Sequence, residues 1–301
     1  MPVPASTARK PWVAAILSLL STGLGHIYCG NIVTGLVLFL LSLLFAPVAV
    51  LVAFLHPSTA ALLGLIASFL AVIGAYIFAV LHSYALARRQ REEYLPRDYN
   101  RALVYTLFIL VGVSYPPSIV HYLRSAVFEA FVVPTSSEAP NILPGDRVLV
   151  NKLILRGRYP QRGDVVVFRP PHNRKQNWIK RVIGLPGDTV AVRGNDVFLN
   201  GKKLDREREP AGSLPSESHG DIFTESNSGR RYLVQLSPTN KATASFAEQK
   251  VPEAMCFVLG DNRNDSRDSR EFGFVPLGEV VGVFQYIYYP AENWERFGAY
   301  Q

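Results

Sequence analysis

The sequence predicts a multi-span α-helical membrane region followed by an all-β extracytoplasmic domain of coiled antiparallel sheets. Two observations predict this class. Of the 301 residues 49% are hydrophobic, and most of that hydrophobicity lies before residue 125, in long runs without a formal charge. After residue 125, short runs alternate between apolar and polar residues and are separated by turn residues, a pattern typical of strands. A chain of this length can hold a membrane part and one sizeable domain.

The membrane region is predicted from four apolar runs, at 12–28, 33–55, 60–87 and 102–123. The second and third exceed the roughly 20 residues that a helix needs to cross a bilayer. The first follows two basic residues, but it has no convincing small-residue cleavage site and leads into more membrane sequence. We therefore expect it to be retained rather than removed as a signal peptide. The expected segments are an N-terminal membrane region at 1–87, a cytoplasmic linker at 88–101 and a transmembrane anchor at 102–124.

Basic residues predict the orientation of these runs. Arg9 and Lys10 precede the first run, and the linker carries Arg88, Arg89, Arg91, Arg97 and Arg101. Cytoplasmic flanks of membrane helices collect such residues, so the N-terminus and the linker are both expected to be cytoplasmic. Two cytoplasmic ends require an even number of crossings. We therefore interpret the short first run, which carries GLGHIYCG at 23–30, as re-entrant or interfacial, with glycines that permit close helix packing.

The β domain is expected to span 125–301, on the outer face of the membrane. Its predicted strands include RVLV, DVVVF, DTVAV, DVFLN, RYLVQL, FVLG and VVGVFQYIYY, with turns at Arg193-Gly194-Asn195-Asp196 and Asn200-Gly201. A more polar stretch at about 203–250 contains one hairpin signal, Asn227-Ser228-Gly229, and is interpreted as a variable insertion.

Composition excludes several classes of function. The net charge of +7 is explained by arginines that flank the apolar runs, so no nucleic-acid partner is expected. Two cysteines, Cys29 and Cys256, provide neither a disulfide framework nor metal-ligand spacing. No cofactor motif is visible, so we expect neither a cofactor nor a metal.

The stretch at 131–152, FVVPTSSEAPNILPGDRVLVNK, is the first candidate site. It places three hydroxyl side chains, Thr135, Ser136 and Ser137, between Pro134 and Pro140. Proline resists regular structure, so these hydroxyls are expected in a rigid extended segment. A hydroxyl held rigidly just after a membrane run is a candidate nucleophile.

A serine that hydrolyses peptides needs a base, a group that orients the base, and an oxyanion hole. No histidine fits well, because His82 and His121 lie in or beside membrane runs while His172 and His219 lie in loops. A lysine can serve where its surroundings favour the neutral amine. Lys180 lies in a strand-like apolar run and is therefore the candidate base.

Two further blocks extend the pattern. KRVIGLPGD lies at 180–188 and GDNRNDSRDSREFGFVP at 260–276. Together with the 131–152 stretch, they resemble in order and spacing the signature blocks of type I signal peptidases, the membrane-anchored Ser/Lys proteases of bacteria. The resemblance covers about residues 110–290. It implies a serine endopeptidase of the bacterial cytoplasmic membrane that removes signal peptides from exported preproteins on the outer face, with the lipid bilayer as its second partner.

The resemblance also implies a role for individual residues. Ser137 is the nucleophile, Lys180 the general base, and Ser266 the residue that hydrogen-bonds Lys180. The Thr135 hydroxyl and the Ser137 N–H form the oxyanion hole. The supporting residues are Asp268, Arg270 and Arg181, and the substrate pocket is lined by Val133, Pro134, Glu138, Ile142, Trp178 and Ile179.

Glu138 departs from the family pattern, which has methionine after the nucleophile. In an extended segment successive side chains alternate, so Glu138 is expected to point away from Ser137 and to border the pocket without contacting Lys180. Contact would stabilise the ammonium form of the lysine and oppose its action as a base. We therefore expect Glu138 to alter substrate preference rather than abolish activity.

Two alternatives remain open. The chain can be a catalytically weakened or specialised homologue, or a membrane scaffold that acts through its N-terminal spans. A self-cleaving Ser/Lys repressor shares the chemistry, but it needs a soluble DNA-binding part where this chain has four apolar runs.

Overall fold

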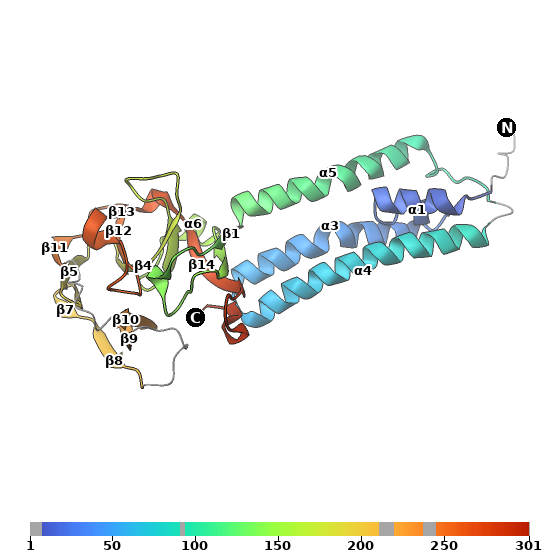
Figure 1. The fold of residues 1–301 in the computed structure, drawn as a ribbon. Helices are drawn as coiled ribbons and strands as arrows, with labels where there is room; N and C mark the ends of the chain where they lie inside the picture. Colours follow the sequence, from blue (N-terminus) through green and yellow to red (C-terminus); the bar gives the residue numbers. More distant parts are fainter. Residues whose placement is uncertain (1–7, 91–93, 211–219, 237–244, 301) are drawn as a thin grey trace. The chain divides into compact units, whose positions relative to one another are not determined.

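The chain divides at Val127 into a helical unit and a β unit (Figure 1). The computed structural model describes residues 8–90, 94–210, 220–236 and 245–300. Arg91 and parts of the predicted insertion, 211–219 and 237–244, lie outside the described residues. A helical region followed by antiparallel sheets confirms the predicted fold class.

Among its described residues, the helical unit contains three helices long and apolar enough to cross a membrane. Their mean hydropathies are 2.9 for α3, 2.4 for α4 and 1.8 for α5. Large apolar side chains such as Leu44, Leu70 and Leu107 are more than half exposed on these helices, as expected of surfaces that face lipid. The helices are α1 (Pro11–Leu20), α2 (Leu24–Tyr28), α3 (Ile32–Leu55), α4 (Thr59–Arg89) and α5 (Ala102–Ala126).

The first apolar run is not one continuous helix. It forms α1, of 10 residues, and α2, of 5 residues, separated by Gly23 in the left-handed region at φ 86°. A 10-residue helix rises about 15 Å, half the thickness of the hydrocarbon core. The backbone N–H of Lys10 donates to the Tyr28 hydroxyl at 3.2 Å, so the two ends of the run lie next to each other.

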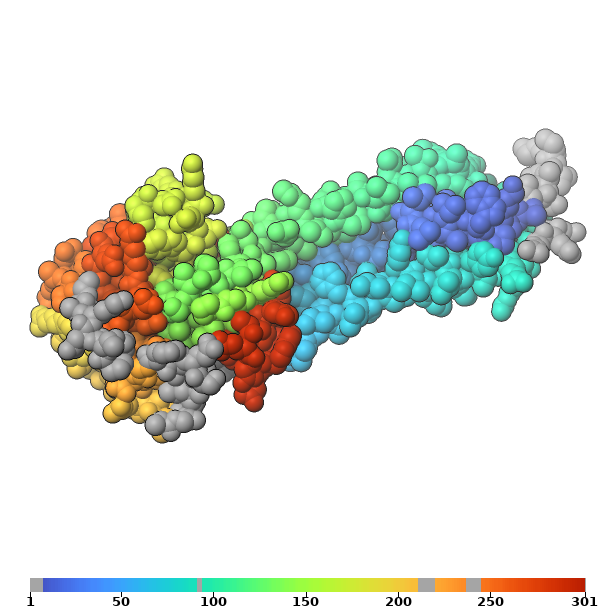
Figure 2. All heavy atoms as spheres, in the orientation of Figure 1, coloured from blue at the N-terminus to red at the C-terminus, as the bar shows by residue number. Residues whose placement is uncertain are grey.

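Close packing holds α1 against α4. The Ser83 hydroxyl of α4 donates to the Ala14 carbonyl at 3.3 Å, and it lies 3.0 Å from the hydroxyl of Ser18. A Cβ added at Gly25 would lie 2.1 Å from the Ala14 carbonyl oxygen, so only glycine fits there. In Figure 2 the dark blue α1 lies directly on α4 without a gap.

The β unit is built around one eight-stranded antiparallel sheet, in the order β1-β2-β14-β3-β4-β12-β13 with β15 paired to β14. Two smaller sheets, β10-β9-β8 and β11-β5-β6-β7, adjoin it. The strands are β1 (Phe128–Val132), β2 (Arg147–Asn151), β3 (Val165–Phe168), β4 (Trp178–Gly184), β5 (Thr189–Arg193), β6 (Asp196–Leu199), β7 (Lys202–Lys203), β8 (Asp205–Arg208), β9 (Asp221–Asn227), β10 (Arg230–Leu236), β11 (Phe246–Lys250), β12 (Met255–Leu259), β13 (Val275–Pro276), β14 (Val280–Tyr289) and β15 (Gly298–Ala299).

The described residues of the predicted insertion, 203–250, do not form a single separate body. They supply the three-stranded sheet and also β11, which pairs with β5 of the other small sheet. The β9–β10 hairpin turns through Ser228 at φ 53° and Gly229 at φ 84°, where positive φ favours the residue types of this turn.

Short helical segments connect the strands. They are η1 (Ser136–Glu138), α6 (Ile154–Gly157), α7 (Ser269–Phe272), η2 (Leu277–Glu279) and η3 (Trp294–Arg296). Of these, η1 matters most for the site, because it carries the hydroxyl residues of the 131–152 stretch.

Candidate active site

The three-residue segment Ser136–Glu138 forms one turn of 3₁₀ helix, η1, so the expectation of an extended segment was wrong. The N–H of Ala139 closes the turn on the Ser136 carbonyl at 3.0 Å. Asn262, on the loop after β12, donates its backbone N–H to the Ser137 carbonyl at 3.1 Å and its side-chain amide to the Ser136 carbonyl at 3.3 Å. Contacts from a distant part of the chain therefore fix the turn.

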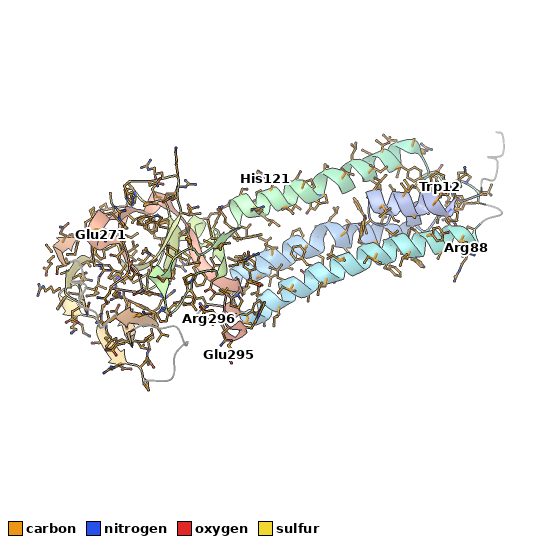
Figure 3. All side chains as sticks on the ribbon, viewed as in Figure 1. Trp12, Arg88, His121, Glu271, Glu295 and Arg296 are labelled. Carbon is orange, nitrogen blue, oxygen red and sulfur yellow. The ribbon has the colours of Figure 1, made fainter. Side chains whose placement is uncertain are left out.

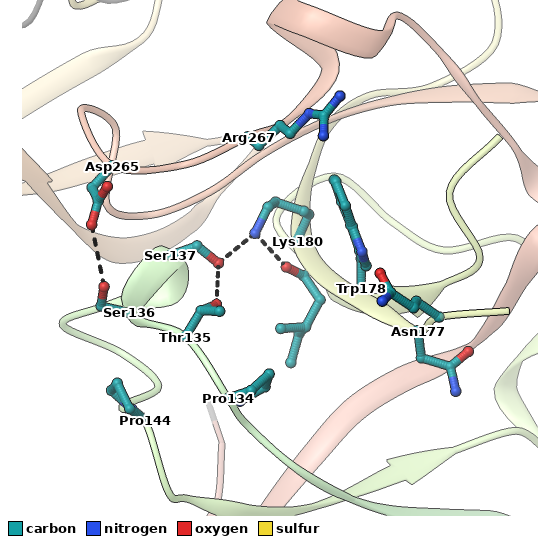
Figure 4. A pocket seen from close by; sticks show the side chains of 12 residues that line it. Pro134, Thr135, Ser136, Ser137, Pro144, Asn177, Trp178, Lys180, Asp265 and Arg267 are labelled. Carbon is teal, nitrogen blue, oxygen red and sulfur yellow. Dashed lines mark hydrogen bonds between the residues drawn. The ribbon is translucent and has the colours of Figure 1, made fainter. Parts of the chain in front are cut away.

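Lys180 projects from β4 onto this turn. Its Nζ lies 2.5 Å from Ser137 Oγ and 2.8 Å from the carbonyl oxygen of Ile179 (Figure 4). The Lys180 side chain is 4% exposed. Residues 43 positions apart in sequence thus form a buried hydroxyl–amine pair.

Glu138 also contacts Lys180, contrary to expectation. Its Oε1 lies 3.0 Å from Nζ, and its side chain is fully buried. The physical reason is the turn: successive side chains of a 3₁₀ helix are rotated by about 120° rather than 180°, so Ser137 and Glu138 both face β4. Burial raises the pKa of Glu138 to about 8, although the nearby Lys180 lowers it.

Ser266 does not make the predicted hydrogen bond to Lys180. Among the described residues its buried Oγ has no hydrogen-bond partner. It lies instead against Gly260, where an added Cβ would come within 2.1 Å of Ser266 Oγ and 2.6 Å of the Ser137 carbonyl oxygen. Glycine at 260 thus lets Ser266 approach the turn, while Glu138 takes the place beside the amine.

A cleft of about 870 Å³ opens on the Ser137 hydroxyl. The Thr135 hydroxyl lies at its edge, 3.3 Å from Ser137 Oγ (Figure 4). The cleft is lined by Pro134, Thr135, Ser136, Ser137, Pro144, Gln176, Asn177, Trp178, Ile179, Lys180, Asp265 and Arg267.

Three residues predicted to line the substrate pocket do not line this cleft. Val133 and Ile142 are 3% and 0% exposed and belong to a core cluster on which Ile179 packs. Their partners in this cluster are residues of the large sheet, Val148, Val165, Phe284 and Ile287. Glu138 is buried against Lys180. The remaining three predicted lining residues, Pro134, Trp178 and Ile179, do face the cleft.

A buried ion pair supports β4 next to the lysine. Arg181 donates from Nε and Nη2 to the Asp261 carboxylate at 2.7 and 2.5 Å, and its guanidinium lies 4.0 Å from the centre of the Tyr232 ring. Asn141, just after the turn, donates to Asp261 Oδ2 at 2.7 Å. Sequence reasoning gave Arg181 a supporting role but missed Asn141, which carries no motif of its own.

The loop after β12 has a second ion pair. Asp268 and Arg270 are 2.7 Å apart, and Asp268 Oδ2 also accepts the N–H of Gly260 at 3.0 Å. The Asp268 carboxylate therefore connects the two ends of this loop. The same loop carries Asn262, which contacts the η1 turn.

A family model described as signal peptidase, peptidase S26, matches residues 101–289, more than half of the chain. This chain belongs to the signal peptidase family, S26. The matched range includes the turn, β4 and the loop after β12. Membership makes the protein a hydrolase of the serine endopeptidase class, as the three sequence blocks predicted, and its apolar helices fit a membrane protein.

Two relatives are similar to this chain over most of their own length. Signal peptidase I of Rickettsia bellii is 34% identical over 212 residues, covering 60% of this chain and 71% of the relative. Signal peptidase I of Bacillus caldolyticus is 35% identical over 178 residues, covering 57% and 85%. The crystal structure of a signal peptidase I from Enterococcus faecalis is 35% identical and covers 42% of this chain and 97% of that chain, with a TM-score of 0.26.

The raised pKa of Glu138 predicts a pH-dependent stability. A carboxyl group whose pKa is raised by folding binds its proton more tightly in the folded chain than in the unfolded chain, so the folded state loses stability as the pH rises from 4.5 towards about 8. The melting temperature of wild type should therefore fall relative to that of Glu138→Gln between those pH values. Thermal unfolding of both proteins in detergent measures this, with the exposed Glu248→Gln as the control. A melting-temperature difference that stays constant with pH would contradict the prediction.

Proposed function

We propose that the protein is a membrane-bound signal peptidase in which Ser137 is the nucleophile and Lys180 the general base. The observation that carries this proposal is the 2.5 Å contact between Lys180 Nζ and Ser137 Oγ, buried at the floor of an open cleft. Membership of the family supports signal peptides of exported preproteins as the substrates.

Acylation begins when Lys180 Nζ takes the hydroxyl proton of Ser137 and Oγ attacks the carbonyl carbon of the scissile peptide. The Thr135 hydroxyl, 3.3 Å from Ser137 Oγ, and the Ser137 N–H donate to the oxyanion that forms. When the tetrahedral intermediate collapses, the C–N bond breaks. The Lys180 ammonium then protonates the leaving amine of the mature protein.

Deacylation runs through the same groups. Lys180 Nζ takes a proton from a water molecule, and the oxygen of that water attacks the ester carbonyl on Ser137. The C–O bond to Ser137 breaks, and the lysine returns a proton to the serine oxygen. One buried amine thus serves both halves of the reaction, because it is a base before each attack and an acid after it.

The cleft favours an extended peptide with small apolar side chains near the cut. Pro134, Trp178 and Ile179 provide apolar surface on its walls. Lys180 is 4% exposed, so only a backbone that approaches closely can reach Ser137. Small residues permit that approach.

The helical unit supports the predicted orientation. Trp12 and Arg88 lie at one end of this unit and His121 at the other (Figure 3). Tyr99 donates to the Gly30 carbonyl at 2.8 Å, which places the end of α2 beside the linker. The run from 12 to 28 therefore enters and leaves at the linker end. In the proposed topology α3 and α4 cross the membrane, the linker is cytoplasmic and α5 crosses outward.

The topology predicts the results of reporter fusions. Fusions after residues 10 and 95 should report the cytoplasm, and a fusion after residue 200 should report the outside, because basic flanks stay inside. Paired reporters that are active only inside or only outside measure this in cells. An outside signal at residue 10 would contradict the re-entrant first run.

The Ser/Lys assignment predicts the effect of single substitutions. Ser137→Ala and Lys180→Ala should each lower kcat/KM for a preprotein by about 10³-fold or more, since each removes a group that reacts in every turnover. Lys180→Arg should fail equally, because a guanidinium does not deprotonate in proteins. Processing of a preprotein by full-length protein in detergent measures these losses.

Matched controls come from the same domain. Ser226→Ala on β9 and Lys202→Ala, whose side chain is 79% exposed, should remain within a few-fold of wild type. Retained cleavage in Lys180→Ala, or a dependence on one of the histidines, would overturn the assignment.

A further inference from the structure

We propose that Glu138 is the positioning residue of this site: its buried carboxyl holds the Lys180 amine on Ser137, in the place expected for the Ser266 hydroxyl. This inference rests on the proposed function, because positioning has meaning only if Lys180 is the base. It gives Glu138 a role in the reaction that methionine, the residue expected at this position, cannot perform because it has no carboxyl group.

The geometry around Nζ leaves no room for another orienting group. Lys180 Nζ has three partners, Ser137 Oγ at 2.5 Å, Ile179 O at 2.8 Å and Glu138 Oε1 at 3.0 Å. An ammonium has three protons, and a neutral amine has two protons and one lone pair, so three contacts use its full capacity. Two of them fix the direction of the third, which is the bond to the nucleophile.

The burial of Glu138 is costly without such a role. The side chain is fully buried, and among the described residues Oε2 has no hydrogen-bond partner. A carboxyl group in such surroundings loses its hydration, whereas an apolar side chain of the same length would fill the space without that loss. The contact with Lys180 is what the carboxyl provides and an apolar side chain would not.

The other charged groups near Glu138 do not replace this contact. Asp261, after β12, raises the pKa of Glu138, and Arg181, also on β4, lowers it. These two residues form a bidentate ion pair with each other. Arg181 Nη2 also donates to the hydroxyl oxygen of Tyr300, near the C-terminus, at 2.6 Å. Lys180 is the partner that Glu138 itself hydrogen-bonds.

The contact has two opposing effects on the reaction. A carboxylate beside the amine stabilises the ammonium that forms when the Ser137 proton moves, which lowers the barrier at high pH. Before Lys180 can act as a base, the pair must lose the proton that the carboxyl and the amine share, and this delays the onset of activity as the pH rises. Because Glu138 does not line the cleft, neither effect changes which residues are accepted before the cut.

The test is the pH profile of kcat/KM for full-length protein in detergent, from about pH 5 to about pH 10. In Glu138→Gln and Glu138→Met the onset of activity should move to lower pH by about one unit or more. Their plateau should fall by up to about tenfold per unit of that shift. The cleavage-site preference should stay that of wild type. Glu248→Gln, the same change at an exposed glutamate, should keep the wild-type profile.

Ser266→Ala separates the two candidate orienting groups. If Glu138 positions the amine, Ser266→Ala should keep the wild-type onset. A shifted onset in Ser266→Ala together with an unshifted one in both Glu138 variants would overturn the inference while leaving the Ser/Lys assignment intact. An inactive wild type would instead overturn the proposed function, and the inference with it. Thermal unfolding of each variant shows that the profiles come from folded protein.

Discussion

The site depends on one contact, the 2.5 Å approach of the buried Lys180 amine to the Ser137 hydroxyl at the wall of the cleft. Two independent features of the fold must agree for it to form. The register of β4, in which Lys180 lies opposite Val166 of β3, sets the position of the lysine side chain. The η1 turn sets the position of the Ser137 hydroxyl. A slip of one residue in β4 would move the lysine to the other face of the sheet.

Buried ion pairs on β4 and the loop after β12 keep these two features in register. Arg181 follows the lysine directly and is held by Asp261, while Arg263 is held by Glu225, with side chains that are at most 2% exposed. Breaking such a buried pair by removing one partner costs about 3–5 kcal/mol. The pairs are therefore less a source of stability than a constraint, because any other arrangement of the loop after β12 would leave a buried charge without a partner.

The sequence predicted the architecture better than the direction of single side chains. Periodicity and turn residues predicted the long helices and most strands of the large sheet, since both follow from local pattern. The conformation of η1 does not follow from local pattern, because Asn262, 125 positions after Ser137, stabilises it by a hydrogen bond. The error at Glu138 follows from that turn, because an alternation rule for extended chain was applied to residues that are not extended. The error at Ser266 has another origin, since its hydrogen bond to Lys180 was expected from the family resemblance and Glu138 contacts the amine instead.

The central claim is that Ser137 carries the acyl group during cleavage. Its most direct test is a single turnover of a preprotein with excess full-length enzyme, quenched with acid and mapped by mass spectrometry. The account predicts an ester of the signal peptide on the peptide that contains Ser137, present in wild type and absent in Lys180→Ala. An adduct on any other residue, or cleavage that persists in Ser137→Ala, would contradict it.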